Sequence, residues 1–269
     1  MLKSFIAIAA FAASISTTDA TEVRLGAAKE GGGYDKAMRN LARILKDNDI
    51  VPVVTNFDGS EDIATALCAG KIDFAPLQID AYRNAGERGC QLDPVGVYGS
   101  EITHLFFPKG SDKDELHDLG KGDAILIGKI GSGSALTFET MVSIEKGEHG
   151  NKSDWSNVTL VHKDHTRADA AVAADGVDAV FLVSTMTHPT LKKLMKSGWE
   201  MGDVDDKDIN DLEFNGASLY TQVDTSYEGY WTDRDTYEVR TLYAATMDFA
   251  SDNPEAFNVI TRVMDSLKR

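Results

Sequence analysis

The sequence has few cysteines and few basic residues for its length of 269 residues. Two cysteines are too few for the disulfide framework of a small secreted scaffold. Lys and Arg total 27 against 43 Asp and Glu, which gives a formal net charge of −16. This charge repels nucleic acid and anionic lipid surfaces over roughly 8 Å in physiological salt. We therefore expect no nucleic-acid partner, although a small site within an acidic protein can be locally positive.

Apolar runs long enough to cross a membrane are also missing. A spanning helix needs about 20 apolar residues, whereas the run near the amino terminus covers only residues 5–15. Lys3 precedes this run, and the small residues Thr18 and Ala20 follow it. The arrangement predicts a secretory signal peptide over residues 1–20, cleaved near Ala20; a buried helix at the start of a cytosolic chain is the alternative. We therefore expect an exported protein, most simply in a bacterial periplasm.

Cys68 and Cys90 both lie in the part of the chain that would be exported. An oxidising compartment permits a bond between them. Closing a loop of this size would stabilise the fold by roughly 3 kcal/mol in the chain-entropy model. Two unpaired, small apolar side chains are the alternative, and the sequence leaves both open.

Motifs for metal binding are lacking as well. His162 and His165 would come together only in a helix, whereas the apolar residues before them predict a strand. The acidic stretch 203–211 lacks the central glycine and the final glutamate of a calcium loop, and is more typical of a solvated helix start. We expect no metal site and no cofactor.

Signatures of catalysis are equally weak. The chain has neither a phosphate-binding loop ending in Lys-Ser or Lys-Thr nor a Gly-x-Gly-x-x-Gly motif opening a helix. Ser132 and Ser134 lie in no nucleophile elbow with a matched histidine. The protein is therefore predicted not to be an enzyme. A periplasmic enzyme stays the rival from a different class, because serine and histidine side chains far apart in sequence can meet in the fold.

What the sequence does contain is a regular alternation of short apolar runs and amphipathic segments. The runs typical of strands cover residues 23–26, 51–54, 74–77, 95–97, 103–107, 124–127, 158–161 and 179–183. Helical spacing or helix-start signals mark residues 37–45, 60–69, 134–146, 167–174 and 253–267. This alternation predicts an α/β fold whose mostly parallel sheets are flanked by helices.

The strands and helices form two series, which indicates two lobes. The turn Pro108–Ser111 separates the series. We expect lobe I to contain residues 21–108 and 239–269, and lobe II to contain residues 109–238.

Clusters of glycine and serine stand between a strand and a helix at three places, Gly31–Tyr34, Gly59–Ser60 and Gly131–Ser134. Each would lie at the carboxyl end of a strand, where open α/β sheets bind ligands. Each also opens a helix, whose first N–H groups lack partners and attract a carboxylate. Helix capping without a ligand is the alternative. Gln78–Asp80 similarly ends a strand and starts a helix, either as part of a site or as a cap formed by Asp80.

The order and spacing of these pieces resemble the TAXI family of substrate-binding proteins, the extracytoplasmic receptors of TRAP transporters. The resemblance covers residues 22–268 and lies in Leu25 with Gly26, Gly32–Tyr34, Gly59–Ile63, Gly70–Ala75, Gln78–Asp80, Ile127–Ser134, Gly176–Phe181 and Glu238–Leu242. The chain departs from the family pattern in having Asp35 after Tyr34, in Ser184–Thr187 and in the stretch 223–229.

The resemblance implies a type II periplasmic-binding-protein fold, in which two lobes close on a ligand. Family ligands are small anions, among them glutamate-like amino acids and dicarboxylates, which the receptor passes to a membrane permease. We accordingly expect a monomer that binds a small carboxylated solute. A receptor of the same fold that serves an ABC importer or a sensor kinase is the alternative. The residues expected to bind the solute are Gly33, Tyr34, Ser60, Gln78 and Asp80 from lobe I, and Ser132, Gly133, Ser134 and Thr185 from lobe II.

Overall fold

The computed structural model describes residues 22–165, 174–226 and 233–267. The predicted signal peptide, most of the helix expected over 167–174 and the stretch 227–229 lie outside these residues. None of the helices in the described part is both long and apolar enough to cross a membrane.

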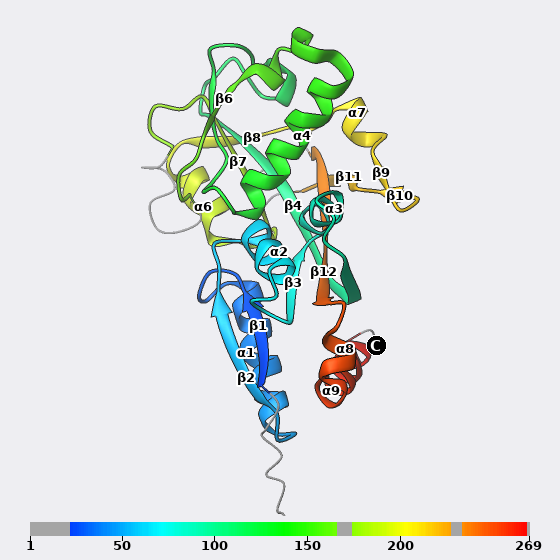
Figure 1. Cartoon of the computed structure of the whole chain (residues 1–269). Coiled ribbons are helices and arrows are strands. Elements are labelled where there is room, and N and C mark those ends of the chain that lie inside the picture. The colour runs from blue at the N-terminus through cyan, green and yellow to red at the C-terminus, as the bar shows by residue number, and fades with distance from the viewer. Residues whose placement is uncertain (1–21, 166–173, 227–232, 268–269) are drawn as a thin grey trace, which may run out of the picture.

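The elements fall into a first half, a second half and long strands that run between them (Figure 1). The first half comprises residues 22–91 and 247–267, with β1 (Glu22–Ala27), α1 (Gly33–Lys46), β2 (Val51–Asn56), α2 (Ser60–Cys68), β3 (Phe74–Gln78), α3 (Ile79–Glu87), α8 (Phe249–Asp252) and α9 (Pro254–Leu267). The crossing strands are β4 (Leu92–Pro108) and β12 (Arg234–Thr246), with β11 (Tyr220–Thr225) beside β12.

The second half comprises residues 109–165 and 174–219. Its elements are β5 (Ala124–Leu126), α4 (Gly133–His149), β6 (Thr159–Val161), β7 (Ala179–Ser184), α6 (Pro189–Lys196), β8 (Trp199–Gly202), α7 (Lys207–Asn210), β9 (Glu213–Phe214) and β10 (Ala217–Ser218). Short 3-10 turns cover Leu116–Asp118, Gly150–Lys152 and Trp155–Asn157.

Two parallel blocks of strands form the ends of a continuous sheet in the described part of the chain. The strand order is β2-β1-β3-β12-β4-β7-β5-β6, with β11 added to β12 and β8 added to β4. Strands β1, β2 and β3 pair in parallel, as do β5, β6 and β7, whereas β12 and β4 run antiparallel to their neighbours between the blocks. The expected α/β fold, with mostly parallel sheets flanked by helices, is confirmed.

The expectation of two separate strands over 95–97 and 103–107 is wrong, because β4 runs unbroken from Leu92 to Pro108. Its first part pairs with β12 as far as Ile102, and from Ile102 onward it pairs with β7. Backbone hydrogen bonds therefore continue through the polar residues between the two apolar runs. The sheet changes partners at Ile102, within β4, and the chain turns only after Pro108, where Ser111 N–H donates to the Pro108 carbonyl at 2.9 Å. The exact division of the chain into lobes stays a prediction.

Burial explains why these segments form these elements. Every residue of β7, from Ala179 to Ser184, is buried, as expected for a parallel strand covered on both faces. In α1 the apolar residues Met38, Leu41 and Leu45 recur at helical spacing and are buried against the first-half core. In α4, Phe138 packs against Phe181 and Trp155 in the second-half core. Each half therefore has its own apolar core.

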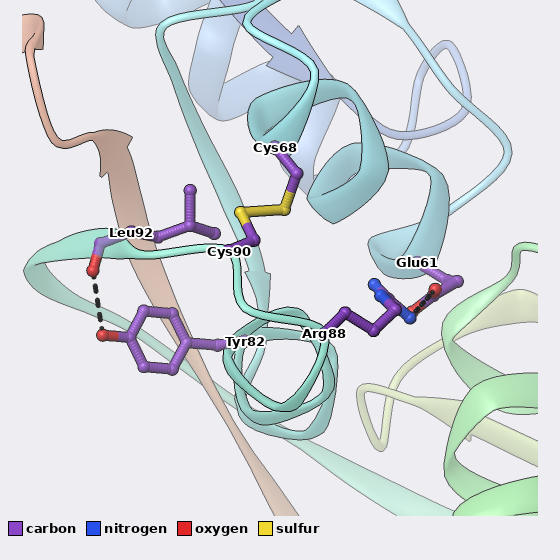
Figure 2. Close-up of a disulfide and its surroundings, with 6 residues drawn as sticks. All are labelled: Glu61, Cys68, Tyr82, Arg88, Cys90 and Leu92. Atoms are coloured by element: carbon purple, nitrogen blue, oxygen red, sulfur yellow. Dashed lines mark hydrogen bonds and ion pairs between the residues drawn. A yellow bond between two sulfur atoms is a disulfide. The ribbon is translucent and has the colours of Figure 1, made fainter.

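Cys68 and Cys90 form a disulfide, which answers the question that the sequence left open (Figure 2). It joins the last residue of α2 to the segment after α3, with Cα atoms 5.6 Å apart. The Arg88–Glu61 ion pair at 2.6 Å adds a second tie between these two segments. Together, the disulfide and the ion pair hold α2 against the segment that follows α3.

Candidate functional site

The glycine and serine turns predicted from sequence meet where the two halves touch. Gly59, just before α2, faces the turn Gly131–Gly133 that opens α4. A Cβ atom built on Gly59 would lie 2.6 Å from Ser132 Cα and 2.8 Å from Gly133 N, which is closer than real Cβ atoms come to other atoms. We call this backbone-to-backbone approach the glycine contact. It requires glycine at position 59, because any larger residue would push the halves apart.

Two ion pairs join the halves near the glycine contact. Lys129 Nζ lies 3.2 Å from Asp58 Oδ1, and Lys29 Nζ lies 2.7 Å from Asp164 Oδ1. The side chains of Lys129 and Asp58 are 42% and 44% exposed, so this pair contributes at most about 1 kcal/mol and is screened by salt.

Gln78 lies between the two halves and has neighbours in both. It is the last residue of β3 and the N-cap position of α3, and it is 1% exposed. Its backbone N–H donates to Ser60 Oγ at 3.2 Å, and its side-chain Nε2 donates to Glu101 Oε2 at 3.1 Å. Its Oε1 is buried without a hydrogen-bond partner among the described residues, and lies 2.1 Å from where a Cβ on Gly133 would stand. An unsatisfied buried acceptor of this kind costs about 1–3 kcal/mol.

Glu101 hydrogen-bonds to two of the predicted site residues, and the sequence did not point to it. It is on β4, opposite Val239 of β12 and one residue before the strand changes partners. Tyr34 from α1 donates its hydroxyl to Glu101 Oε2 at 3.5 Å. Burial, together with the nearby charge of Asp80, raises the pKa of Glu101 to about 7, although the hydrogen bonds from Gln78 and Tyr34 act in the opposite direction. Glu101 therefore titrates near neutral pH.

Tyr34 itself is buried beside Tyr98, with the two rings edge to face and their centroids 5.1 Å apart. Burial and the charge of Glu101 hold the pKa of its phenol well above the usual value. Tyr34 is therefore a neutral hydrogen-bond donor at any ordinary pH.

Asp80 is fully buried and is satisfied on every side. One oxygen accepts from Thr137 Oγ1 of α4 at 2.6 Å and from Tyr220 OH of β11 at 3.0 Å, while the other accepts from Ala81 N–H at 2.8 Å. Burial raises the pKa of Asp80, and these hydrogen bonds partly offset the rise. Asp80 thus connects the first half to the second, and the N-cap position of α3 belongs to Gln78 instead.

Ser132 and Ser134 already accept hydrogen bonds from the backbone. Ser132 Oγ caps α4 by accepting from Ala135 N–H at 3.2 Å, and Ser134 Oγ accepts from Val183 N–H at 2.9 Å. Capping, the alternative given by the sequence for this turn, is thus observed for Ser132. The backbone N–H groups of Gly133 and Ser134 belong to the first turn of α4, where they have no partner within the helix and carry partial positive charge.

The structure brings some of the predicted site residues together and not others. Contacts across the two halves are made by Gln78, Asp80, Ser132 and Gly133. Tyr34 and Ser60 bond to Glu101 and Gln78, whereas Ser134 bonds within the second half. Gly33 and Thr185 are exposed, Gly33 at the start of α1 and Thr185 just after β7. Cavities of about 270 and 320 Å³ lie elsewhere, and residues of the glycine contact line neither of them.

Comparisons with known proteins give the fold. No protein-family model and no curated protein matches the sequence. Among solved structures, the substrate-binding protein of an amino acid ABC transporter has a TM-score of 0.55 at 17% identity, covering 92% of this chain and 93% of that one. An ancestral arginine-binding protein bound to arginine has a TM-score of 0.53 at 19% identity, covering 92% of each chain.

The alkanesulfonate-binding protein from Xanthomonas axonopodis pv. citri, bound to MOPS, is similar too. Its TM-score is 0.53 at 16% identity, and the match covers 92% of this chain and 72% of that one. These likenesses extend over nearly the whole of this chain, including both parallel blocks and the crossing strands between them. The chain has the fold of the type II periplasmic binding proteins.

Proposed function

We propose that the protein is an exported, monomeric receptor, not an enzyme, that binds a small solute between its two halves. The observation that carries the proposal is Gln78 Oε1, a buried acceptor without a partner among the described residues, positioned between the starts of α2 and α4. A solute that donates a hydrogen bond to this oxygen would remove its desolvation cost. The fold supports the same reading, since the solved structures described above include binding proteins for amino acids and sulfonates.

The groups around Gln78 are of two kinds, and together they describe the solute. The N–H groups of Gly133 and Ser134 at the start of α4 suit a carboxylate. The carboxyl group of Glu101 and the unpartnered acceptors Gln78 Oε1 and Thr241 Oγ1 suit a donor such as an ammonium group. Thr241 stands opposite Gln78 in the sheet. A solute with a carboxylate and an amine satisfies both, so within the predicted class a glutamate-like amino acid fits better than a dicarboxylate.

Two likenesses bear on the transporter that the receptor serves. The resemblance to the TAXI family favours delivery to the permease of a TRAP transporter, with the chain exported to the periplasm by the segment ending near Ala20. The likeness to the substrate-binding protein of an amino acid ABC transporter favours the alternative, an ABC importer.

Solute uptake between the halves requires them to separate and close again. The glycine contact leaves no space for even a methyl group at position 59, so a solute reaches Gln78 only when the halves move apart. The crossing strands β4 and β12 are the elements that would bend, as in hinge closure around a ligand.

The proposal is tested by binding and by one matched pair of variants. Amino acids, dicarboxylates and oxo-acids are screened by thermal shift, because a ligand that binds only the native state raises the melting temperature. The affinity of the best solute is then measured for Gly59→Ala and Gly147→Ala. A Cβ at position 59 meets backbone atoms of the second half, whereas a Cβ at Gly147 on α4 meets nothing within 4 Å.

We expect Gly59→Ala to weaken binding by at least about 100-fold, which corresponds to about 3 kcal/mol of lost closure energy. Gly147→Ala should bind like the unaltered protein. A Gly59→Ala variant that binds the solute with full affinity would show that the halves do not close on it.

A further inference from the structure

A second group of polar residues gathers in the second half, away from the glycine contact. Glu145 and His149 lie four residues apart near the end of α4, so they share one face of the helix. Asp208 comes from the short helix α7, which packs against α4. His149 Nε2 lies 2.6 Å from Asp208 Oδ2, and one potential ligand atom from each of the three residues lies within 4.8 Å of the others. We call these three residues the outer cluster.

Glu145 is the buried member of the outer cluster. Its side chain is 5% exposed, and its Oε2 atom is buried without a hydrogen bond in the part of the chain that the structure describes. A buried carboxylate is costly unless a charge or a set of donors compensates it. The neighbouring Asp206, by contrast, accepts from Trp155 Nε1 at 3.2 Å and from the N–H groups of Asp208 and Ile209 at 2.9 and 3.3 Å.

The surroundings favour a cation at this place. The outer cluster lies at the carboxyl end of α4, where the unpaired carbonyls carry partial negative charge. The whole chain has a formal net charge of −16. A cavity of about 320 Å³ is lined by Glu145 and His149, together with His117 and Asp154, and has room for water ligands. Lys152, which also lines this cavity, is exposed, and no ion pair joins it to Glu145 in the described part of the chain.

We propose that Glu145, His149 and Asp208 bind a first-row divalent transition-metal ion, with Zn²⁺ as the representative. One imidazole nitrogen and two carboxylates match the preferences of such ions, whereas Ca²⁺ and Mg²⁺ take oxygen ligands alone. Bonds of about 2.0–2.2 Å place ligand atoms about 3–4 Å apart. The present spacing, within 4.8 Å, reaches that arrangement through side-chain rotation. Water from the adjoining cavity completes the coordination.

The sequence hides this site for two identifiable reasons. The helix predicted there ended at residue 146, which left His149 outside it and concealed the spacing of four residues from Glu145. Asp208 belongs to the acidic stretch 203–211, which is typical of a solvated helix start, and this stretch does contain the start of α7. Only the packing of α7 on α4 brings Asp208 to the other two ligands.

The test is calorimetric titration of ZnCl₂ into the exported chain after treatment with a chelator. We expect one ion per chain with saturable binding. His149→Ala and Glu145→Gln should each weaken the affinity by at least about 10-fold, in line with the loss of a ligand. His162→Ala is the matched control, because His162 also lies beside a carboxylate, 3.5 Å from Glu139, but outside the outer cluster. Its affinity should stay unchanged.

A visible spectrum of the Co²⁺-loaded protein adds a second readout, because His149→Ala removes its only nitrogen ligand and should shift the spectrum. Melting in excess chelator shows whether each variant folds. If His149→Ala does not fold, Asp208→Asn on α7 decides the question by the same titration. Equal zinc affinity in the unaltered chain, His149→Ala and Asp208→Asn would overturn the proposal, as would a chain that binds no zinc.

Discussion

The interface between the halves buries the carboxylate of Asp80, and the outer cluster buries that of Glu145. The two carboxylates differ in their hydrogen bonds. Asp80 receives hydrogen bonds from Thr137, Tyr220 and its own neighbour Ala81, so both of its oxygens are satisfied. Glu145 has a buried oxygen without any partner among the described residues. Burial alone therefore does not reveal the role of an acidic side chain. Asp80 acts as a structural link between the halves, while Glu145 is available to a ligand.

The largest expected effect comes from removing the satisfied carboxylate. Asp80→Ala leaves the buried hydroxyls of Thr137 and Tyr220 without their acceptor and breaks a link between α3 and α4. We expect the free energy of unfolding to fall by about 3 kcal/mol. Urea denaturation measured in the presence of a chelator gives this quantity directly.

The matched control for this prediction is Glu145→Gln under the same conditions. Glutamine keeps the shape of the side chain and removes a charge that has an unpaired oxygen. We expect a change within about 1 kcal/mol, because no good hydrogen bond is lost at that oxygen. If both variants lose the same stability, the contrast between the two carboxylates is wrong.

The comparison also shows which parts of the site the sequence reveals. The sequence predicts that Gly59, Gln78 and Gly131–Ser134 lie at or just after strand ends, and they do. An apolar strand followed by glycine or serine and then a helix is a local pattern. In each block the parallel strands have their carboxyl ends at the same edge of the sheet, so the residues that follow these strands lie close together.

The residues that were missed depend on non-local packing. Glu101 lies in the middle of the long strand β4, in a polar stretch that resembled a connection between two strands. Its position becomes meaningful only because β12 and β7 pair with β4 on either side of Ile102. The sequence predicts Asp80 as a ligand or a cap, because its partners Thr137 and Tyr220 are 57 and 140 residues away. No local pattern specifies such contacts.

Glu101 is intermediate between Asp80 and Glu145, because it has two donors and a pKa of about 7. Its folded-state pKa lies above the value of 4.5 for a free glutamate, so the folded protein holds the proton more tightly than the unfolded chain. Stability from this group is complete below about pH 4.5 and is lost as the pH rises to about 7. We expect a loss of about 3 kcal/mol over this window.

Urea denaturation at several pH values, compared between the unaltered protein and Glu101→Gln, isolates this contribution. Glutamine is neutral throughout, so the decline between pH 4.5 and 7 should flatten by the same amount. If the pH profile of Glu101→Gln matched that of the unaltered protein, other groups would cause the decline in the free energy of unfolding. Glu101 would then resemble Asp80, whose oxygens are all hydrogen-bonded.

The smallest expected loss of stability comes from substituting Ser132. Variants at this position distinguish a role in helix capping from a role in solute binding. Ser132→Ala removes the acceptor for Ala135 N–H at the start of α4 and should lower the free energy of unfolding by about 1 kcal/mol. Ser143→Ala is the matched control, because Ser143 is exposed within the same helix and should change stability by less than about 0.5 kcal/mol.

Ser132→Asp then restores a capping oxygen but adds a negative charge beside Gly133. If the turn holds the solute carboxylate, Ser132→Asp should regain most of the lost stability while binding the solute at least about 10-fold more weakly. Full solute affinity in Ser132→Asp would leave Ser132 as a cap alone and move the carboxylate away from the start of α4.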